Sequence, residues 1–195
     1  MNKKHSKEDI LEKGQAIIRQ KGYNNTGVND ILRACAIPKG SFYNFFSSKE
    51  EFGIQLLDYY GQKNLVWIDE ILSNPNESPL TRLKTLYMRL ATAPDRDPNF
   101  GGCLVYNMAN EMGPISDSIA AAANRNFQLW VDRVTICVAQ AQAVKEISNQ
   151  LDAAELAEFM HTSISGTMAR AKSLRDKAPL LLMYNFIFDY IDSKK

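Results

Sequence analysis

The sequence predicts an all-α fold with about nine helices. Apolar residues recur at the three- and four-residue spacing of helices along most of the 195 residues. No segment of the sequence shows the sustained alternation of apolar and polar residues that is typical of a half-buried strand. Helix-capping residues and prolines separate the periodic segments at short intervals, and a hydrophobic content of 45% is enough for a substantial core.

Three short helices are expected in the first 48 residues, as a separate N-terminal unit. Each is marked by residues that favour a helix start or a helix end. We expect Ser6, Asp9 and Gly22 to bound the first, Thr26 and Ala36 the second, and Pro38 to open a third over residues 39–46.

The rest of the chain is expected to form a larger helical domain, residues 49–195. Capping residues and apolar periodicity define its helices. The predicted ranges are 49–74, 79–93, 103–112, 116–144, 152–174 and 179–192, with an irregular segment at 94–102. A domain boundary is therefore expected after residue 48.

Composition and cysteine spacing exclude several classes of protein. The first ten residues lack an apolar segment and no run of about eighteen apolar residues occurs, so we expect a cytoplasmic protein without a membrane span. Cys35, Cys103 and Cys137 lie far apart and lack the spacing of a zinc site or of a disulfide framework. We therefore expect free thiols, no metal and no cofactor.

Charge is distributed unevenly along the chain. Residues 1–50 carry a net charge of +4 and the remainder −3, although the whole chain is at +1. A basic N-terminal unit is typical of a protein that faces a polyanion such as nucleic acid.

The last two predicted helices indicate self-association. The segment from Leu180 to Ile191 is apolar on nearly every face, so it needs two buried surfaces. The preceding helix carries Ser163, Gly166 and Ala169 at three-residue spacing, which lets another helix approach closely. We expect these helices from two subunits to form a four-helix interface. Burial of both faces inside one subunit is the alternative.

Residues 22–52 carry a specific motif. A Gly-aromatic turn, a threonine and a short helix precede a Lys-Gly pair, and tyrosine, phenylalanine and lysine then follow at three-residue spacing. This pattern resembles the DNA-binding unit of the TetR family of transcription regulators, through Gly22, Tyr23, Thr26, Val28, Ile31, Lys39, Gly40, Tyr43, Phe46 and Lys49. The resemblance implies a helix-turn-helix, a homodimer on palindromic double-stranded operator DNA, and a helical body that responds to an inducer.

Ala36 departs from the family pattern, which has a glycine in this turn. Glycine is favoured there because it adopts positive φ without a clash of its Cβ. Alanine is expected either to be mildly strained there or to alter the turn slightly, at a cost of about 1 kcal/mol that is too small to change the assignment.

The resemblance and the chemistry of the side chains together give the candidate DNA contacts. Thr26 and Lys49 are expected to bind phosphates, and Gly40 would let the recognition helix approach the duplex closely. Asn44 is expected to read a base through adenine N6 and N7. The complete set is Thr26, Lys39, Gly40, Ser41, Tyr43, Asn44 and Lys49.

Three phenylalanines in this motif have two expected roles. Phe42 and Phe46 are four residues apart, so we expect them to pack in the core of the N-terminal unit. Phe45 is expected to be partly exposed on the DNA side.

The larger domain carries aromatic and polar residues suited to an effector site. The candidates are Cys103, Tyr106, Trp67, Trp130, His161 and Lys172, together with Tyr87, Met108, Phe127 and Met160. Plain core packing is the alternative for each aromatic residue, each methionine and His161.

Cys103 is the candidate for which the sequence indicates a specific chemical role, that of a reactive thiol. It follows a glycine pair and begins a helix, where amide dipoles lower the pKa of a thiol and favour the thiolate. It resembles the cysteine of a branch of the family that responds to reactive electrophiles, and Lys172 would support the thiolate if the fold brings it near. A small buried side chain at a tight helix start is the alternative.

These features predict a DNA-binding transcription regulator, most simply a repressor that a small molecule or a cysteine modification releases from its operator. A protein-interaction adaptor with a vestigial DNA-binding unit is the alternative, although it would be expected to lose Lys39, Tyr43 or Lys49. No catalytic signature surrounds Cys103 or His161, so an enzyme that uses these two residues is not expected and no catalytic residue is assigned.

Overall fold

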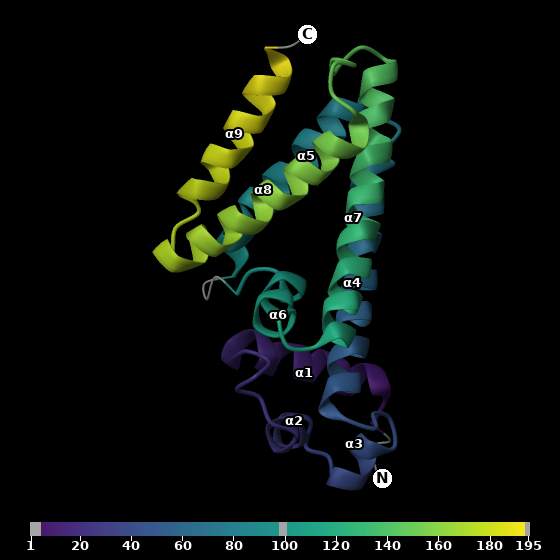
Figure 1. Ribbon diagram of the computed structural model, residues 1–195, viewed down its shortest axis with the longest axis vertical. Coiled ribbons are helices and arrows are strands. Elements are labelled where there is room, and N and C mark those ends of the chain that lie inside the picture. The colour runs from purple at the N-terminus through teal and green to yellow at the C-terminus, as the bar shows by residue number, and fades with distance from the viewer. Residues whose placement is uncertain (1–4, 98–100, 194–195) are drawn as a thin grey trace. The chain divides into compact units, whose positions relative to one another are not determined.

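The computed structural model describes residues 5–97 and 101–193, which are drawn as solid ribbons in Figure 1. All regular secondary structure in these two ranges is helical, as predicted. In chain order the elements are α1 Lys7–Lys21, α2 Val28–Cys35, α3 Lys39–Tyr43, α4 Lys49–Leu72, α5 Pro79–Ala91, the 3-10 helix η1 Ala93–Arg96, α6 Leu104–Met112, α7 Asp117–Ala143, α8 Ala153–Leu174 and α9 Ala178–Asp192. None of these helices is long and apolar enough to cross a membrane.

Several helix starts are set by the capping residues that the sequence indicates. The Ser6 hydroxyl accepts a hydrogen bond from the Asp9 N–H at 3.0 Å, and the Asp9 carboxylate accepts one from the Ser6 N–H at 3.2 Å. The Asp152 carboxylate accepts from the N–H groups of Ala154 and Glu155. These bonds satisfy amides that the first turn of a helix leaves without partners, which confirms the predicted starts of α1 and α8.

The start of α2 differs from the prediction. Thr26 is fully buried, and its hydroxyl donates to the carbonyl of Gly22 at 2.7 Å. The N-cap is Gly27, whose N–H donates to the carboxylate of Asp30 at 2.9 Å. The expected Thr26 cap is therefore wrong, because its hydroxyl points back to the end of α1.

Two other boundaries also differ. α3 ends at Tyr43 and not at Phe46, with Asn44 as its C-cap. The segment expected to be irregular begins with η1, whose last residue is Arg96. Both differences lie at short elements, where one or two hydrogen bonds decide the boundary.

The described chain divides into two compact units. The first unit comprises residues 1–63 and 103–126, and the second comprises 64–102 and 127–195. The long helices α4 and α7 contribute to both, so the units do not follow chain order. The domain boundary expected after residue 48 stays a prediction.

The first unit is built around three aromatic rings. Phe42, Phe46 and Phe52 are fully buried, and their ring centroids lie 5.1 to 5.7 Å apart. This confirms the predicted core roles of Phe42 and Phe46. Phe45 is partly exposed, also as predicted.

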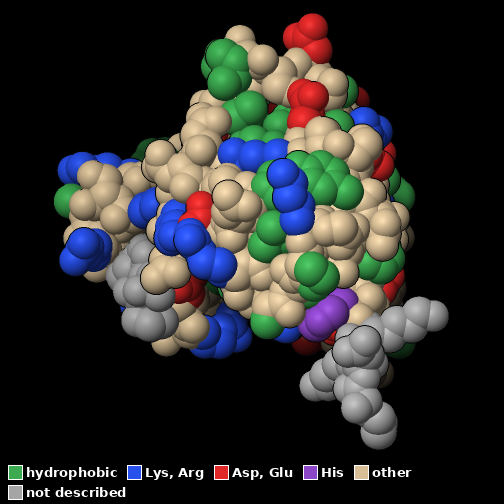
Figure 2. Space-filling model, turned by 90° about the horizontal axis from the view of Figure 1, so that it is seen from below, with side chains coloured by type: hydrophobic (Ala, Val, Ile, Leu, Met, Phe, Trp, Pro, Cys, Tyr) green, Lys and Arg blue, Asp and Glu red, His purple; other side chains and the backbone are tan. Residues whose placement is uncertain are grey.

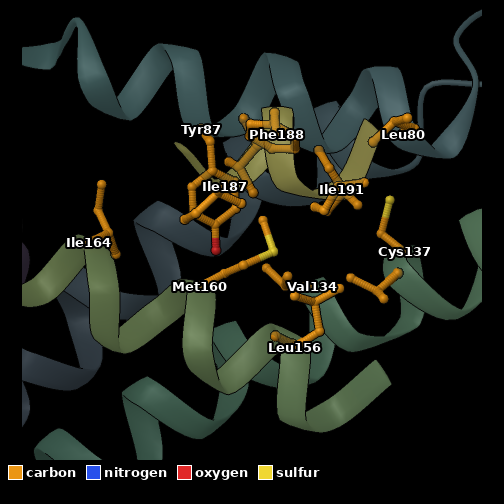
Figure 3. Close-up of a cluster of buried hydrophobic side chains, with 14 of the residues drawn as sticks. Leu80, Tyr87, Val134, Cys137, Leu156, Met160, Ile164, Ile187, Phe188 and Ile191 are labelled. Atoms are coloured by element: carbon orange, nitrogen blue, oxygen red, sulfur yellow. The ribbon is translucent and has the colours of Figure 1, made fainter. Parts of the chain in front are cut away.

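The second unit has an apolar core between α5, α7, α8 and α9, shown in Figure 3. Tyr87 from α5 stacks edge-on against Phe188 from α9, at 6.0 Å between ring centroids. Met160 from α8 and Val134 from α7 complete the same cluster. α9 packs against both α8 and α5, so its inner face is fully used within the subunit.

Candidate DNA-binding surface and effector sites

The turn between α2 and α3 has the backbone geometry of a helix-turn-helix. Ala36 has φ 54° and ψ 45°, in the left-handed region. Its N–H donates to the carbonyl of Arg33 at 3.2 Å, and the N–H of Ile37 donates to the carbonyl of Leu32 at 3.1 Å. These bonds close the end of α2 and turn the chain into α3. The predicted positive φ at a non-glycine residue is confirmed.

α3 presents one side to the core and the other to solvent. Phe42 anchors the buried side, while Lys39, Tyr43 and Asn44 are exposed. The ammonium of Lys39 lies 5.8 Å from the centroid of the Tyr43 ring. Figure 2, viewed from the end where Figure 1 draws α2 and α3, shows Lys and Arg side chains beside hydrophobic ones. Such a mixture suits phosphate and base contacts on a duplex.

Gly40 lies at an open position of α3. Apart from its chain neighbours and the nearby backbone of α3, no atom of the described residues lies within 4 Å of the position that a Cβ would occupy. Its helical backbone does not require glycine either, since it is not among the residues with positive φ. Neither packing nor backbone geometry therefore explains a glycine at this position of α3.

Lys49 is held in place by Tyr23. The Tyr23 hydroxyl donates to the backbone carbonyl of Lys49 at 3.0 Å, and the Lys49 ammonium lies 4.3 Å from the Tyr23 ring centroid. Burial lowers the pKa of Lys49, and the nearby carboxylate of Glu111 opposes this effect. The side chain is thus a positioned cation at the first turn of α4.

Thr26 lies in the turn between α1 and α2. Its side chain is buried, and its hydroxyl donates to the carbonyl of Gly22. The phosphate contact expected of Thr26 stays a prediction, as do the DNA contacts expected of Lys39, Gly40, Ser41, Tyr43, Asn44 and Lys49.

Glu111, near the end of α6, is a residue that the sequence did not reveal. Its carboxylate accepts a hydrogen bond from the backbone N–H of Asn24 at 3.0 Å. The same carboxylate lies against Gly22, which has φ +85°. The charge of Glu111 also acts on Lys49. Glu111 therefore connects α6 to the α1–α2 turn and to a candidate DNA contact. A contact across 87 residues leaves no local signal in the sequence.

Cys103 is the N-cap of α6, as expected from its place after the glycine pair. Burial of its sulfur raises the pKa of the thiol, even though part of the residue surface reaches solvent. The N–H groups of Tyr106 and Val105 and the Tyr60 side chain favour the thiolate, but burial outweighs them. The expected lowering of the pKa is therefore wrong.

In the second unit, four of the sequence candidates lie together through ring contacts. The Trp67 and Trp130 rings are 6.2 Å apart, and the His161 ring lies 6.5 Å from Trp130 and 5.1 Å from Phe127. Burial lowers the pKa of His161 to about 4, so the imidazole is neutral at physiological pH. We call Trp67, Tyr87, Phe127, Trp130 and His161 the aromatic cluster.

The remaining candidates lie elsewhere. Cys103 and Tyr106 belong to the first unit, while Lys172 is exposed on α8 in the second. The groups that shift the Cys103 pKa, which include Arg19 and Tyr60, belong to the first unit as well. The expected support of the Cys103 thiolate by Lys172 stays a prediction.

Comparison with known proteins identifies the family. A family model described as "Bacterial regulatory proteins, tetR family" matches residues 10–54, and one described as "Tetracyclin repressor-like, C-terminal domain" matches residues 79–187. The chain belongs to the TetR family. As a member of the TetR family it is a DNA-binding transcription regulator with an N-terminal helix-turn-helix domain, and residues 10–54 match the N-terminal family model.

Individual TetR-family relatives cover nearly the whole chain. The HTH-type transcriptional repressor DhaR of Mycobacterium sp. (strain GP1) is 31% identical, over 94% of this chain and 90% of its own. The transcriptional regulator AcuR of Cereibacter sphaeroides is 34% identical, over 85% and 75%. A crystal structure of a regulatory protein TetR from Rhodobacter sphaeroides superposes with a TM-score of 0.86 at 31% identity, over 92% and 95%. The reduced form of E. coli NemR shares the fold, with a TM-score of 0.84 at 21% identity over 93% and 94%.

Proposed function

We propose that the chain is a repressor that binds a two-fold symmetric operator as a homodimer and leaves it when an effector occupies the second unit. The observation that carries the DNA-binding part is the exposed side of α3, where Gly40 has no structural reason to be glycine. Because Gly40 has no side chain, the backbone of α3 can approach a DNA duplex closely. The repressor assignment draws on relatives such as DhaR, which is named a transcriptional repressor.

The proposed contacts divide into two kinds. Lys39, Tyr43 and Lys49 serve as phosphate contacts that fix the register of α3 and carry no base information. Asn44, exposed at the end of α3, is the proposed base reader, because its amide can pair with the N6 and N7 of adenine.

The proposed dimer interface is the outer face of α8 and α9. Phe159, Leu182, Phe186 and Tyr190 are large hydrophobic residues that α8 and α9 leave exposed. Gly166 on α8 is exposed as well, and apart from its chain neighbours and the nearby backbone of α8, no described atom lies within 4 Å of where its Cβ would be. An apolar face with a close-approach glycine suits packing against the same face of a second subunit. Dimerisation would then place two recognition helices on one operator.

Release of the operator has two proposed routes. A small molecule that binds the aromatic cluster is the first, because the cluster is apolar and is built by four helices that a ligand could rearrange. Modification of Cys103 is the second, since Cys103 begins the helix that carries Glu111 at its other end. The two routes are distinguishable by substitution at Cys103.

The proposed function is tested by selecting duplexes from a random library with the full-length protein. We expect a palindromic consensus, bound by two chains, and no enrichment by a variant that carries both Asn44→Ala and Lys49→Ala. The DNA beside the chain's own gene should contain a match, and binding there should reduce transcription in vitro. Failure to enrich any sequence would contradict the proposal.

A further inference from the structure

Tyr87 and Trp130 hold two buried polar atoms without hydrogen-bond partners among the described residues. Tyr87 on α5 is fully buried, and neither its hydroxyl oxygen nor the indole nitrogen of Trp130 on α7 has a partner. Leaving a buried polar group unsatisfied costs about 1–3 kcal/mol. Native proteins therefore rarely retain such a group without a use for it.

The two unsatisfied atoms share one neighbourhood. Burial raises the pKa of Tyr87, and the Trp130 side chain lies close enough to the hydroxyl to oppose this shift. The two groups nevertheless do not meet the geometry of a hydrogen bond with each other. In Figure 3 the Tyr87 hydroxyl points away from Phe188 of α9 and toward α8. Both polar atoms thus lie buried in the second unit without a hydrogen-bond partner among the described residues.

The surroundings of these two atoms are aromatic and uncharged. Trp67 packs edge-on against Trp130, and His161 lies against Trp130 and Phe127. Burial keeps the imidazole of His161 neutral above about pH 4. The exposed Arg89 places its guanidinium 4.9 Å from the centroid of the Trp67 ring. A buried anionic ligand would need a buried cation to pair with, and the neutral imidazole of His161 does not supply one.

We propose that the Tyr87 hydroxyl and the Trp130 N–H are the two donors that recognise an uncharged ligand through one carbonyl oxygen on an apolar or aromatic body. A carbonyl oxygen has two lone pairs, and an indole N–H and a phenol O–H can each donate to one of them. The flanking rings supply the apolar contacts that hold the body of the ligand. This inference rests on the proposed effector-controlled repressor and specifies the chemical class of its ligand.

Matched pairs of probes separate the carbonyl from the apolar body. The full-length protein is titrated calorimetrically with acetophenone and with cumene, which has nearly the same shape but lacks the oxygen. Cyclohexanone and methylenecyclohexane form a smaller pair, and benzoate tests a charged oxygen. We expect each ketone to bind two- to tenfold more tightly than its hydrocarbon partner, as one hydrogen bond or two would provide. Benzoate should bind more weakly than acetophenone.

Tyr87→Phe is the deciding variant, because it removes the hydroxyl and little else. We expect the ketone preference to shrink in Tyr87→Phe, because one of the two donors is lost and the Trp130 N–H remains, while cumene binds as before. Tyr184→Phe makes the same chemical change on α9 and should leave the preference intact. Without ligand, Tyr87→Phe should melt at the same or a higher temperature, since it removes an unsatisfied hydroxyl.

Several results would overturn the inference. These are equal binding of ketone and hydrocarbon, a preference that Tyr87→Phe leaves undiminished, no binding of any probe, or a marked loss of stability in Tyr87→Phe. The last result would show that the hydroxyl bonds a structural water. Operator release is measured separately on labelled duplex. Ketone binding without release would count against the proposed function alone, and release by a compound that shows no dependence on Tyr87 would count against this inference alone.

Discussion

The carboxylate of Glu111 on α6 accepts a hydrogen bond from the backbone N–H of Asn24, at 3.0 Å, in the turn between α1 and α2. A charge-assisted bond of this kind is stronger than one between neutral groups. The same carboxylate acts on Lys49, a candidate phosphate contact. The position of α6 is therefore tied to the arrangement of the DNA-binding unit by one side chain.

Loss of the Glu111 contact should weaken DNA binding as well as the fold. We expect Glu111→Ala to reduce operator affinity by about three- to tenfold, while its unfolding free energy falls by about 1 kcal/mol. Fluorescence anisotropy and chemical denaturation measure the two quantities. Asn110→Ala, at the exposed neighbouring position of α6, is the control. Equal affinities for Glu111→Ala and the unmodified protein would show that the contact has no role in DNA binding.

Gly40→Ala should lower operator affinity without lowering the stability of the fold. Alanine is favoured over glycine in a helix by up to about 1 kcal/mol, and the site has room for its methyl group. The melting temperature should therefore stay the same or rise. Operator affinity should fall by about tenfold or more, because the added Cβ would hold α3 away from the duplex. Unimpaired binding would place position 40 away from the DNA.

Lys49→Ala should weaken binding to every duplex by a similar factor. A phosphate contact releases a counterion when it forms, so a dimer that loses two such contacts should show a slope of log affinity against log salt shallower by about 2. Binding is measured across a salt series on an operator and on an unrelated duplex. Lys145→Asn in the second unit, where asparagine tolerates the positive φ of that residue, should leave the slope unchanged. If Lys49→Ala shows the same slope of log affinity against log salt as the unmodified protein, Lys49 does not contact the DNA phosphates.

Cys103 should react slowly at neutral pH. Because burial raises the pKa of its thiol, the rate of alkylation by iodoacetamide should keep increasing as the pH rises past 9. Mass spectrometry gives the rate for each cysteine. A rate that reaches its plateau below pH 8 would show a lowered pKa.

The same residue decides between the two routes of release. If Cys103 is a sensor, alkylation or hypochlorite should release the unmodified protein from its operator while Cys103→Ser stays bound. Variants of the buried Cys35 and Cys137 should respond like the unmodified protein. Equal release of Cys103→Ser would leave the aromatic cluster as the effector site.

Neighbouring positions on α9 should respond to charge in opposite ways. Phe186 is 77% exposed and Ile187 only 6%, so Phe186→Asp should give folded monomers with poor operator affinity. Ile187→Asp buries a charge in the core of the second unit and should unfold it. Sedimentation velocity and circular dichroism separate these results. A stable dimer of Phe186→Asp would move the interface to another surface.

Much of the fold could be predicted because helix boundaries depend on neighbouring residues. Less of the candidate sites could be predicted, because they depend on contacts between residues far apart in the sequence. Ser6 and Asp152 cap helices through bonds to residues two or three positions away, so their roles are written in the neighbouring sequence. Thr26 and Gly27 are both acceptable caps, and burial of the Thr26 hydroxyl decided between them.

The candidate sites depend more on tertiary contacts. The pKa of Cys103 was expected to follow its helix start, but enclosure of the sulfur has the larger effect. The contact between Glu111 and Asn24 joins residues whose local sequences give no hint of each other. Grouping of Trp67, Trp130 and His161 likewise depends on how α4, α7 and α8 pack.

Both tryptophans of the sequence lie in the aromatic cluster. Intrinsic tryptophan emission is therefore a native spectroscopic reporter of the second unit, and the DNA-binding unit contributes nothing to it. Occupation of the proposed effector site can be tested in unlabelled protein through this emission, while a dye on the duplex reports operator occupancy in the same cuvette. The order of ligand binding and DNA release can thus be resolved in time without any engineered label on the protein.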